Sequence, residues 1–228
     1  MLKVSELNVA YGLAKVLHDV SVEFQAGQMV FIMGRNGAGK TTFLKTIMGL
    51  LRPLSGTIVY EGVDITKASP EELYRKGFRY VAQDKRVFSD LTVRENIEIA
   101  AYGCREPLDA ALETATAVYP RLKDFFNVKA GQLSGGQRQI LLVGQALVGH
   151  PKLLLIDEPT QGLASVVIGE IVRILSKLRG NVTGIIVEQN VALMKQLADT
   201  VYVMKEGRVS RQINEKSQIA SLLSSSEV

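Results

Sequence analysis

The feature that most constrains this chain is the segment Gly34–Thr42, which reads GRNGAGKTT. It fits the pattern G-x-x-x-x-G-K-[ST], and it lies between the apolar run Met29–Met33 and the helix-like stretch Thr41–Leu51. Glycines let a backbone wrap closely around phosphates, while successive N–H groups and the helix N-terminus point at the anion. An ordinary glycine-rich turn is the alternative, and the flanking strand and helix argue against it. The predicted phosphate-binding residues are Gly34, Arg35, Asn36, Gly37, Ala38, Gly39, Lys40, Thr41 and Thr42.

Within this loop, Lys40 is expected to neutralise phosphate charge and Thr41 to ligate Mg²⁺. A second polar cluster, Asp157 and Glu158, directly follows the apolar run Leu153–Ile156. Ligands of open α/β sheets bind at the carboxyl ends of strands. There Asp157 suits Mg²⁺, directly or through water, and Glu158 suits a general base for an attacking water. Alone, an acidic pair leaving a strand explains them equally well; beside the loop, nucleotide hydrolysis is favoured because it needs both parts.

A third motif, LSGGQ, occupies Leu133–Gln137 and precedes the apolar stretch Ile140–Leu147. Its Ser and Gln have the spacing of a capping box that opens a helix. Capping does not explain the two glycines, which each lower helix propensity by about 1 kcal/mol relative to alanine. Close approach of a phosphate to the helix N-terminus would explain them. The residues predicted to face that phosphate are Ser134, Gly135, Gly136 and Gln137.

Apolar runs alternate with helix-like stretches in the second half of the chain, which is typical of βαβ units on a parallel sheet. These segments are Leu153–Ile156, Val166–Leu178, Gly184–Val187, Val191–Leu197 and Val201–Met204. The first 82 residues instead indicate extended strands over Leu2–Tyr11 and Val16–Phe24, with shorter ones at Thr57–Tyr60 and Gly77–Ala82. Residues 90–131 show helical patterns such as Ala110–Val118 and no long apolar strand, which predicts a helical insertion.

GRNGAGKTT, LSGGQ and LLLIDEP, in this order, resemble an ABC-type ATPase cassette over nearly the whole chain. The resemblance implies an α/β fold: a P-loop NTPase core whose mostly parallel sheet is flanked by helices, an N-terminal antiparallel β subdomain, and a helical insertion. It implies one ABC ATPase domain over residues 1–228, with the core and β subdomain in 1–89 and 132–228 and the helical subdomain in 90–131. In that family two cassettes pair head to tail. ATP lies between the P-loop of one cassette, which is Gly34–Thr42 in this sequence, and the LSGGQ helix of the other.

The resemblance also assigns roles to residues that are unremarkable alone. Tyr11 takes the place of the aromatic that stacks on adenine, a contact worth about 1–3 kcal/mol, although a tyrosine ending a strand often only packs. Gln83 matches the glutamine that reaches Mg²⁺ and the attacking water, so the implied metal set is Thr41, Gln83 and Asp157. The segment Asp84–Ile97 is where such cassettes contact membrane subunits. The implied ligands are ATP and Mg²⁺, and the implied partners are a second cassette, membrane permeases and, indirectly, a solute-binding protein.

Three positions depart from the commonest family sequence. Gln189, in GIIVEQN, stands where a histidine usually meets the γ-phosphate; Ala164 replaces an Asp; and Gln145 stands where an Arg is common. Gln189 can donate a hydrogen bond to phosphate, but it can neither become cationic nor shuttle a proton. We interpret Glu188 and Asn190 as mere neighbours. Because Glu158 is kept, an active ATPase with altered hydrolysis is expected.

These departures, together with YPRLKDFF ahead of LSGGQ, resemble the smaller ATPase subunits of branched-chain amino acid importers and their relatives for urea and short amides. Such a cassette normally works beside a different ATPase that keeps the histidine. A homodimer of the isolated cassette is the alternative. The alternatives are a lipid or lipopolysaccharide exporter ATPase, a soluble ABC ATPase acting on ribosomes or DNA, and a P-loop kinase. The soluble class usually carries two cassettes or a coiled-coil insertion, and a kinase has no reason to carry LSGGQ.

Composition sets the remaining expectations. The chain has 228 residues, is 46% hydrophobic and carries a net charge of +4 without a Lys/Arg block, so a sizeable core is expected and nucleic-acid binding is not indicated. No apolar run approaches the roughly 20 residues that span a bilayer, and no signal peptide is recognisable.

The single cysteine, Cys104, is placed in a loop and favours a reducing compartment. His18 and His150 are expected to be structural or exposed, and the tail Ser221–Val228 to be frayed. The resemblance to an importer ATPase implies, in addition, a peripheral protein on the cytoplasmic face of the inner (plasma) membrane.

Overall fold

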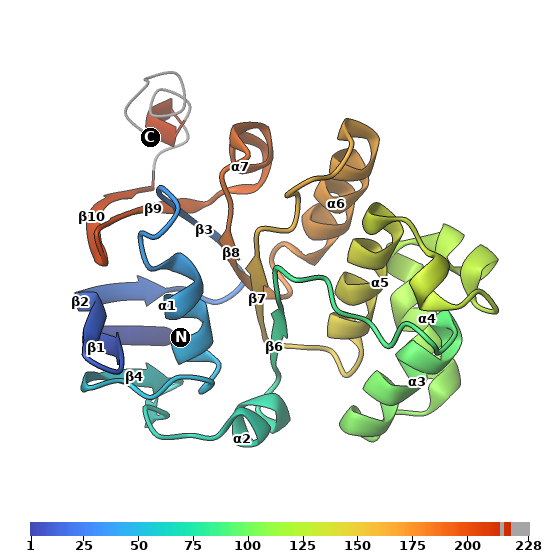
Figure 1. Ribbon diagram of the computed structural model, residues 1–228, viewed down its shortest axis with the longest axis horizontal. Helices are drawn as coiled ribbons and strands as arrows, with labels where there is room; N and C mark the ends of the chain where they lie inside the picture. The colour runs from blue at the N-terminus through green and yellow to red at the C-terminus, as the bar shows by residue number, and fades with distance from the viewer. Residues whose placement is uncertain (215–216, 220–228) are drawn as a thin grey trace.

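Two β-sheets and a set of helices make up the protein, whose structure is a computed structural model describing residues 1–214 and 217–219 (Figure 1). The predicted frayed tail, Ser221–Val228, lies outside the described residues. Within the described part, no helix is both long enough and apolar enough to cross a membrane.

The central sheet has six strands in the order β10-β9-β3-β8-β7-β6. Every pairing in it is parallel except that of β10 with β9, so the predicted mostly parallel sheet is confirmed. All five residues of β3 are buried, as are all five of β7 and of β8, which is why these strands are continuously apolar. The strands are β3 (Met29–Met33), β6 (Phe78–Val81), β7 (Leu153–Asp157), β8 (Thr183–Val187), β9 (Thr200–Lys205) and β10 (Arg208–Ile213).

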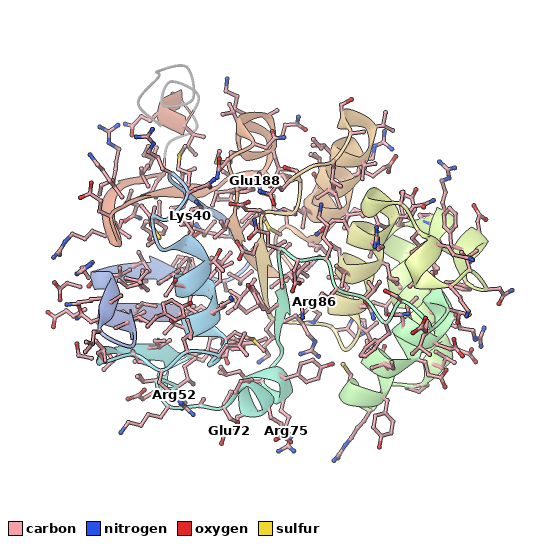
Figure 2. All side chains as sticks on the ribbon, in the orientation of Figure 1. Lys40, Arg52, Glu72, Arg75, Arg86 and Glu188 are labelled. Atoms are coloured by element: carbon pink, nitrogen blue, oxygen red, sulfur yellow. The ribbon has the colours of Figure 1, made fainter. Side chains whose placement is uncertain are left out.

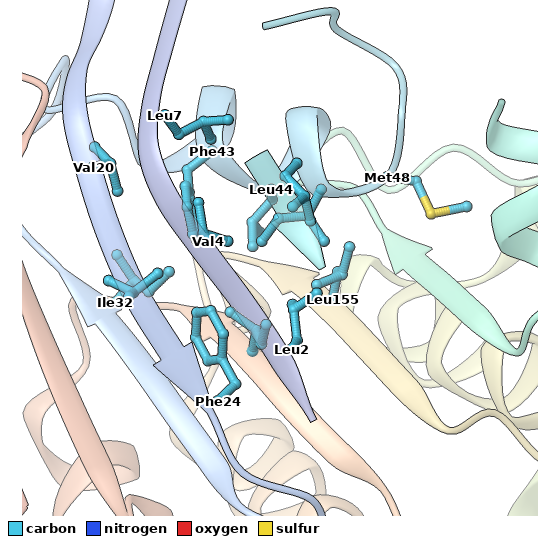
Figure 3. Packing of buried hydrophobic residues seen from close by; sticks show 14 of the residues in the cluster. Leu2, Val4, Leu7, Val20, Phe24, Ile32, Phe43, Leu44, Met48 and Leu155 are labelled. Atoms are coloured by element: carbon cyan, nitrogen blue, oxygen red, sulfur yellow. The ribbon is translucent and has the colours of Figure 1, made fainter. Parts of the chain in front are cut away.

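The second sheet is antiparallel, has the order β2-β1-β4-β5, and is built largely from the N-terminal strands, as predicted. Its strands are β1 (Leu2–Tyr11), β2 (Ala14–Phe24), β4 (Ser55–Tyr60) and β5 (Val63–Asp64). One hydrophobic cluster joins this sheet to the helix that follows the P-loop and to one face of the central sheet (Figure 3). In it, Phe24 of β2 packs against Phe43 of that helix, with ring centroids 6.2 Å apart.

The helices are α1 (Lys40–Ile47), α2 (Pro70–Arg75), α3 (Val93–Cys104), α4 (Leu108–Val118), α5 (Gly135–Leu147), α6 (Ser165–Leu178) and α7 (Val191–Leu197), with 3-10 turns at Pro120–Phe125 and Ala130–Gln132. Helix α1 is shorter than predicted at its C-terminal end. Gly49 has φ +72°, a left-handed conformation, and the N–H groups of Gly49 and Leu50 bond back to the carbonyls of Thr46 and Lys45, so the helix ends there. Cys104 is the last residue of α3, so its predicted loop position is wrong.

Helices α5, α6 and α7 cover the opposite face of the central sheet from α1, through a second cluster that includes Phe31, Ile156 and Ile186. A third cluster joins α3, α4 and α5 and lies to the right of the sheets in Figure 1. The helical part is therefore not packed within residues 90–131 alone, because Leu141 and Val148 of the α5 region belong to its core. The domain bounds given above stay a prediction.

Candidate functional site

Polar residues predicted from the P-loop, from the end of β7 and from the end of β8 meet at one edge of the central sheet. Strands β7 and β8 are neighbours in parallel register, with Asp157 opposite Val187, and the Glu158 N–H donates to the Val187 carbonyl at 2.9 Å. Strand β3, which leads into the P-loop, pairs with β8 on its other side. Figure 2 labels Lys40 at the start of α1 and Glu188 at the end of β8, near each other in the upper middle of the view. The parallel order of these strands therefore brings the loop and the acidic strand ends together.

A pocket of about 440 Å³ lies along the P-loop. Its walls combine loop residues with side chains from the ends of β6 and β7; the lining residues are Val16, Asn36, Gly37, Gly39, Lys40, Thr41, Thr42, Gln83, Glu158 and Gln161. A second pocket of about 380 Å³ also includes Thr41 and Gln83, and there Asp157, Tyr80 and Lys45 contribute. Thr41 and Gln83 are therefore shared walls between the two hollows.

Lys40 lies folded across the P-loop with its side chain buried. Its Nζ donates to the Gly34 carbonyl at 2.7 Å and to the Arg35 carbonyl at 3.1 Å. Burial lowers the pKa of Lys40, while the nearby carboxylates of Glu158 and Asp157 act in the opposite direction. A desolvated ammonium that holds only neutral carbonyls gains strongly from an anion, so this cation is well placed for a phosphate group.

Asp157 has the environment of a carboxylate that needs a cation. It is 1% exposed, and burial raises its pKa, while hydrogen bonds from Thr41 and Tyr80 act against that rise. Its Oδ2 accepts from the Tyr80 hydroxyl at 3.3 Å, and its Oδ1 has no hydrogen-bond partner. No three His, Cys, Asp or Glu side chains gather as a metal cluster in the described part of the chain. A mixed set of oxygens, the Asp157 carboxylate, the Thr41 hydroxyl and the Gln83 amide oxygen, nevertheless suits Mg²⁺.

Glu158 is buried at the pocket wall, and two amides point at its carboxylate. Gln83 Nε2 donates to Glu158 Oε2 at 2.9 Å, and Gln189 Nε2 lies 3.5 Å from Oε1. The same Gln83 nitrogen also donates to Gln161 at 2.9 Å. Glu158 has φ 47°, a left-handed conformation that costs free energy for a residue with a Cβ.

Gln189, which is predicted to donate a hydrogen bond to phosphate, is close to the P-loop. Gln189 Nε2 donates to Asn36 Oδ1 at 2.8 Å, so the end of β8 touches the loop directly. Its neighbour Asn190 caps helix α7, accepting from the N–H groups of Ala192 and Leu193. Asn190 is therefore accounted for by the fold.

The other two departures from the family pattern also have visible consequences. Ala164 is the N-cap of α6 and offers no side-chain cap, whereas an Asp there is a good capping residue. Gln145 of α5 donates to the Asn96 carbonyl of α3 at 2.7 Å, so it joins two helices of the third cluster. Asn96 itself is fully buried and bonds both ways with Phe88.

Two predicted binding elements do not line the P-loop pocket. Tyr11, at the end of β1, is 47% exposed and free to accept a stacking partner. Ser134 and Gln137 form the predicted capping box at the start of α5. Of the two glycines, Gly136 has an internal reason, because an added Cβ would meet the Val167 methyls at 2.8 Å, whereas Gly135 has open space around it. Only Gly135 needs an external explanation.

Sequence reasoning missed Glu188, which is 4% exposed and accepts four hydrogen bonds. A carboxylate directly after a strand carries no pattern that would reveal buried partners 28 positions away. His18 lies in β2, and His150 is exposed, with Nε2 3.7 Å from Glu106, as expected for structural or exposed histidines.

Comparisons with known proteins agree with this geometry. Residues 17–161 match the protein family described as ABC transporter. The chain is 40% identical, over 92% of its length and 91% of the relative's, to the high-affinity branched-chain amino acid transport ATP-binding protein BraG of Pseudomonas aeruginosa. It is 36% identical, over 92% of its length and 90% of the relative's, to the probable branched-chain amino acid transport ATP-binding protein LivF of Archaeoglobus fulgidus.

Solved structures of ATP-binding cassettes are also similar to this chain. A nucleotide-free ATP-binding cassette from an ABC transporter superposes with a TM-score of 0.88 at 28% identity, covering 100% of this chain and 96% of the other. The dimeric post-hydrolysis state of the cassette MJ0796 bound to ADP and Pi superposes with a TM-score of 0.85 at 26% identity, covering 94% and 98%. The chain belongs to the ABC transporter family and is one of its ATP-binding, ATP-hydrolysing cassettes.

Proposed function

We propose that this cassette drives an importer of branched-chain amino acids as its ATPase subunit, working from the cytoplasmic face of the plasma membrane beside separate permease subunits. The observation that carries the ATPase site is the P-loop pocket, which is lined by Lys40 and Thr41 together with Gln83 and Glu158. The solute class rests on the two branched-chain amino acid relatives and on the EQN, GLA and YPRLKDFF segments.

In the proposed site the P-loop N–H groups and Lys40 hold the phosphates of ATP. Thr41, Asp157 and Gln83 would hold Mg²⁺, which would supply positive charge to offset that of the phosphates. Glu158 takes a proton from the attacking water, and the amides of Gln83 and Gln189 orient its carboxylate. Gln189 then donates to a γ-phosphate oxygen with a neutral bond, roughly half as strong as a charge-assisted one.

A single cassette has only half of each proposed ATP site. Ser134, Gly135, Gly136 and Gln137 lie outside the P-loop pocket of their own chain, and the dimeric relative supports a second cassette as the partner. We infer a different subunit for that partner, one that carries a histidine at the place of Gln189. Tyr11 then stacks on adenine at the far end of the loop.

The proposed membrane-subunit contact uses the groove between the core and the helical part. A pocket of about 440 Å³ lies there, with apolar walls from Met48, Leu50, Ala100 and Leu142. Asp84 and Arg86, which belong to the segment Asp84–Ile97, line it as well. Nearby Phe88 is 55% exposed, which supports an apolar partner at this place.

Uptake by cells that lack this protein tests the proposed solute. Loss of labelled leucine, isoleucine and valine uptake, restored by the wild-type gene and not by Lys40→Met, is the expected result. Loss of urea or amide uptake instead would assign the related importer, and a defect in lipid or lipopolysaccharide export would assign an exporter. Unchanged transport of every kind, with ATPase activity intact, would support a cassette that works away from membranes.

A further inference from the structure

The ends of β7 and β8 are tied together by one buried carboxylate, that of Glu188. Its Oε2 accepts from the Thr160 N–H at 3.2 Å and from the Thr160 hydroxyl at 2.9 Å. Its Oε1 accepts from the N–H of Gln189 at 2.9 Å and from that of Asn190 at 3.0 Å. Each oxygen therefore holds a different strand end, and the side chain spans the gap between them.

The backbone of Glu188 is also fixed, by a hydrogen bond to β3. Its own N–H donates to the Ile32 carbonyl at 3.2 Å, which anchors it to β3, the strand that leads into the P-loop. The side chain is 4% exposed, so water cannot replace the lost bonds if the carboxylate is removed. A buried carboxylate is costly unless it is fully hydrogen-bonded, and this one is satisfied by four donors at strand ends.

What these bonds hold is the segment around Glu158. Glu158 has φ 47°, and Thr160 follows it by two positions. A left-handed conformation of such a residue persists only when its surroundings enforce it. The Glu158 N–H bond to Val187 fixes the start of this turn, and the Glu188–Thr160 bonds fix its end.

The second carboxylate oxygen of Glu188, Oε1, fixes the position of Gln189. By holding the N–H groups of Gln189 and Asn190, Glu188 fixes the backbone from which the Gln189 amide reaches Asn36 and Glu158. We propose that Glu188 is a positioning residue for ATP hydrolysis: it clamps the two strand ends so that Glu158 and Gln189 face the same reacting atoms. This inference rests on the proposed roles of those two residues and goes beyond them.

Glu188→Gln tests the clamp with almost no change in volume. An amide side chain can accept at only one of its two ends, so one strand end is released while the other stays bound. We expect kcat for ATP to fall roughly 10- to 100-fold, as small misplacements of catalytic groups do. ATP affinity should stay unchanged, because the bonds of Lys40 to the P-loop carbonyls do not involve Glu188. Affinity is measured with a fluorescent ATP analogue, since the chain has no tryptophan.

Glu106→Gln is the matched control. Glu106 is also a glutamate of low exposure, 12% at the side chain, and its Oε2 accepts from a backbone N–H, that of Gly149, at 2.7 Å. It lines neither P-loop pocket. The same chemical change there is expected to leave kcat at the wild-type value, even if it lowers the melting temperature.

Thr160→Val and Thr160→Ser test the clamp by changing the hydrogen-bond partner of Glu188. The valine removes the hydroxyl donor and the serine keeps it, so kcat is expected to fall several-fold in the first and to stay near wild type in the second. Because both partners act through one bridge, Glu188→Gln with Thr160→Val should be no slower than Glu188→Gln alone. This pair also tests the clamp if Glu188→Gln does not fold.

Glu158→Gln, measured alongside, distinguishes a wrong assignment of the general base from a wrong assignment of the clamp. If Glu158→Gln turns over like wild type, the proposed base is wrong. If Glu158→Gln is inactive while Glu188→Gln keeps wild-type kcat, or loses only as much as Glu106→Gln, the clamp is overturned and the proposed function stands. Additive losses in the double variant would also overturn it.

Discussion

Glu158 and Glu188 stand side by side at the ends of neighbouring strands, one residue beyond the register pair Asp157 and Val187, yet they face different surroundings. Glu158 turns toward the P-loop pocket, where the amides of Gln83 and Gln189 reach it. Glu188 turns toward the backbone, where Thr160 and its own successors saturate it. The same residue type at the same level of the sheet can therefore serve as a reactive group or as a clamp.

The local backbone at the two strand ends contributes to this difference. At the end of β7 the chain enters a left-handed residue at Glu158. At the end of β8 the chain runs on to Asn190, which caps α7. An acidic group that is held open can accept a proton from water, and one that is closed by four donors cannot.

The largest effect on the β7 side, apart from removal of Glu158, is expected from Asp157→Asn. An amide binds Mg²⁺ less well than a carboxylate, so kcat should fall on the order of 100-fold at low Mg²⁺ and recover partly at high Mg²⁺. Titration of ATPase activity with Mg²⁺ measures this shift. A wild-type Mg²⁺ dependence would remove Asp157 from the metal set.

The same variant should be more stable than wild type without nucleotide. Burial raises the pKa of Asp157 in the folded state, so its contribution to folding is present at low pH and is lost as pH rises through that folded pKa. Asparagine never ionises, and at pH 7 its melting temperature should lie a few degrees higher. The difference should vanish in acid; a destabilised variant at pH 7 would contradict this account.

On the β8 side, changes at Gln189 should be milder. Gln189→Ala removes the bonds to Asn36 and Glu158, and kcat in the assembled complex should fall by about 3- to 10-fold, the size of one neutral hydrogen bond. Gln189→His should retain activity and add a pH dependence near the ordinary histidine pKa of about 6.5. Unchanged hydrolysis in Gln189→Ala would return this residue to a purely structural role.

The smallest effect is expected at Tyr11. Because the ring is 47% exposed, Tyr11→Ala should weaken ATP binding by about fivefold, the lower end of the range for stacking on a base. Tyr11→Phe should bind like wild type, because the ring and not the hydroxyl makes the contact. Equilibrium binding of ATP to the three proteins measures the difference, and equal affinities would exclude stacking.

Contiguous motifs were the part of the site that the sequence could predict. The P-loop, the β7 carboxylates and the LSGGQ capping box each lie within a few residues, and the parallel sheet brings the first two together. The place of β8 beside β7 was also predictable from the βαβ alternation. These are local patterns whose physical cause is local.

What could not be predicted depends on contacts between distant segments. Glu188 looks like a bystander until Thr160 is placed against it, and Gly136 looks like part of a ligand site until Val167 of α6 is packed on it. Likewise, Cys104 lies at a helix end, and its Sγ is 3.0 Å from the Tyr74 hydroxyl and 3.1 Å from Arg79 Nη2, which no spacing indicates.

The division of labour between the two glutamates is tested most directly by measuring phosphate release and ATP affinity together on Glu158→Gln. The account predicts an affinity like that of wild type and a kcat at least about 100-fold lower, the size of a lost general base. Glu188→Gln measured in the same way should keep that affinity and lose less activity. Wild-type turnover in Glu158→Gln would contradict the account, because the open carboxylate would then not be the base.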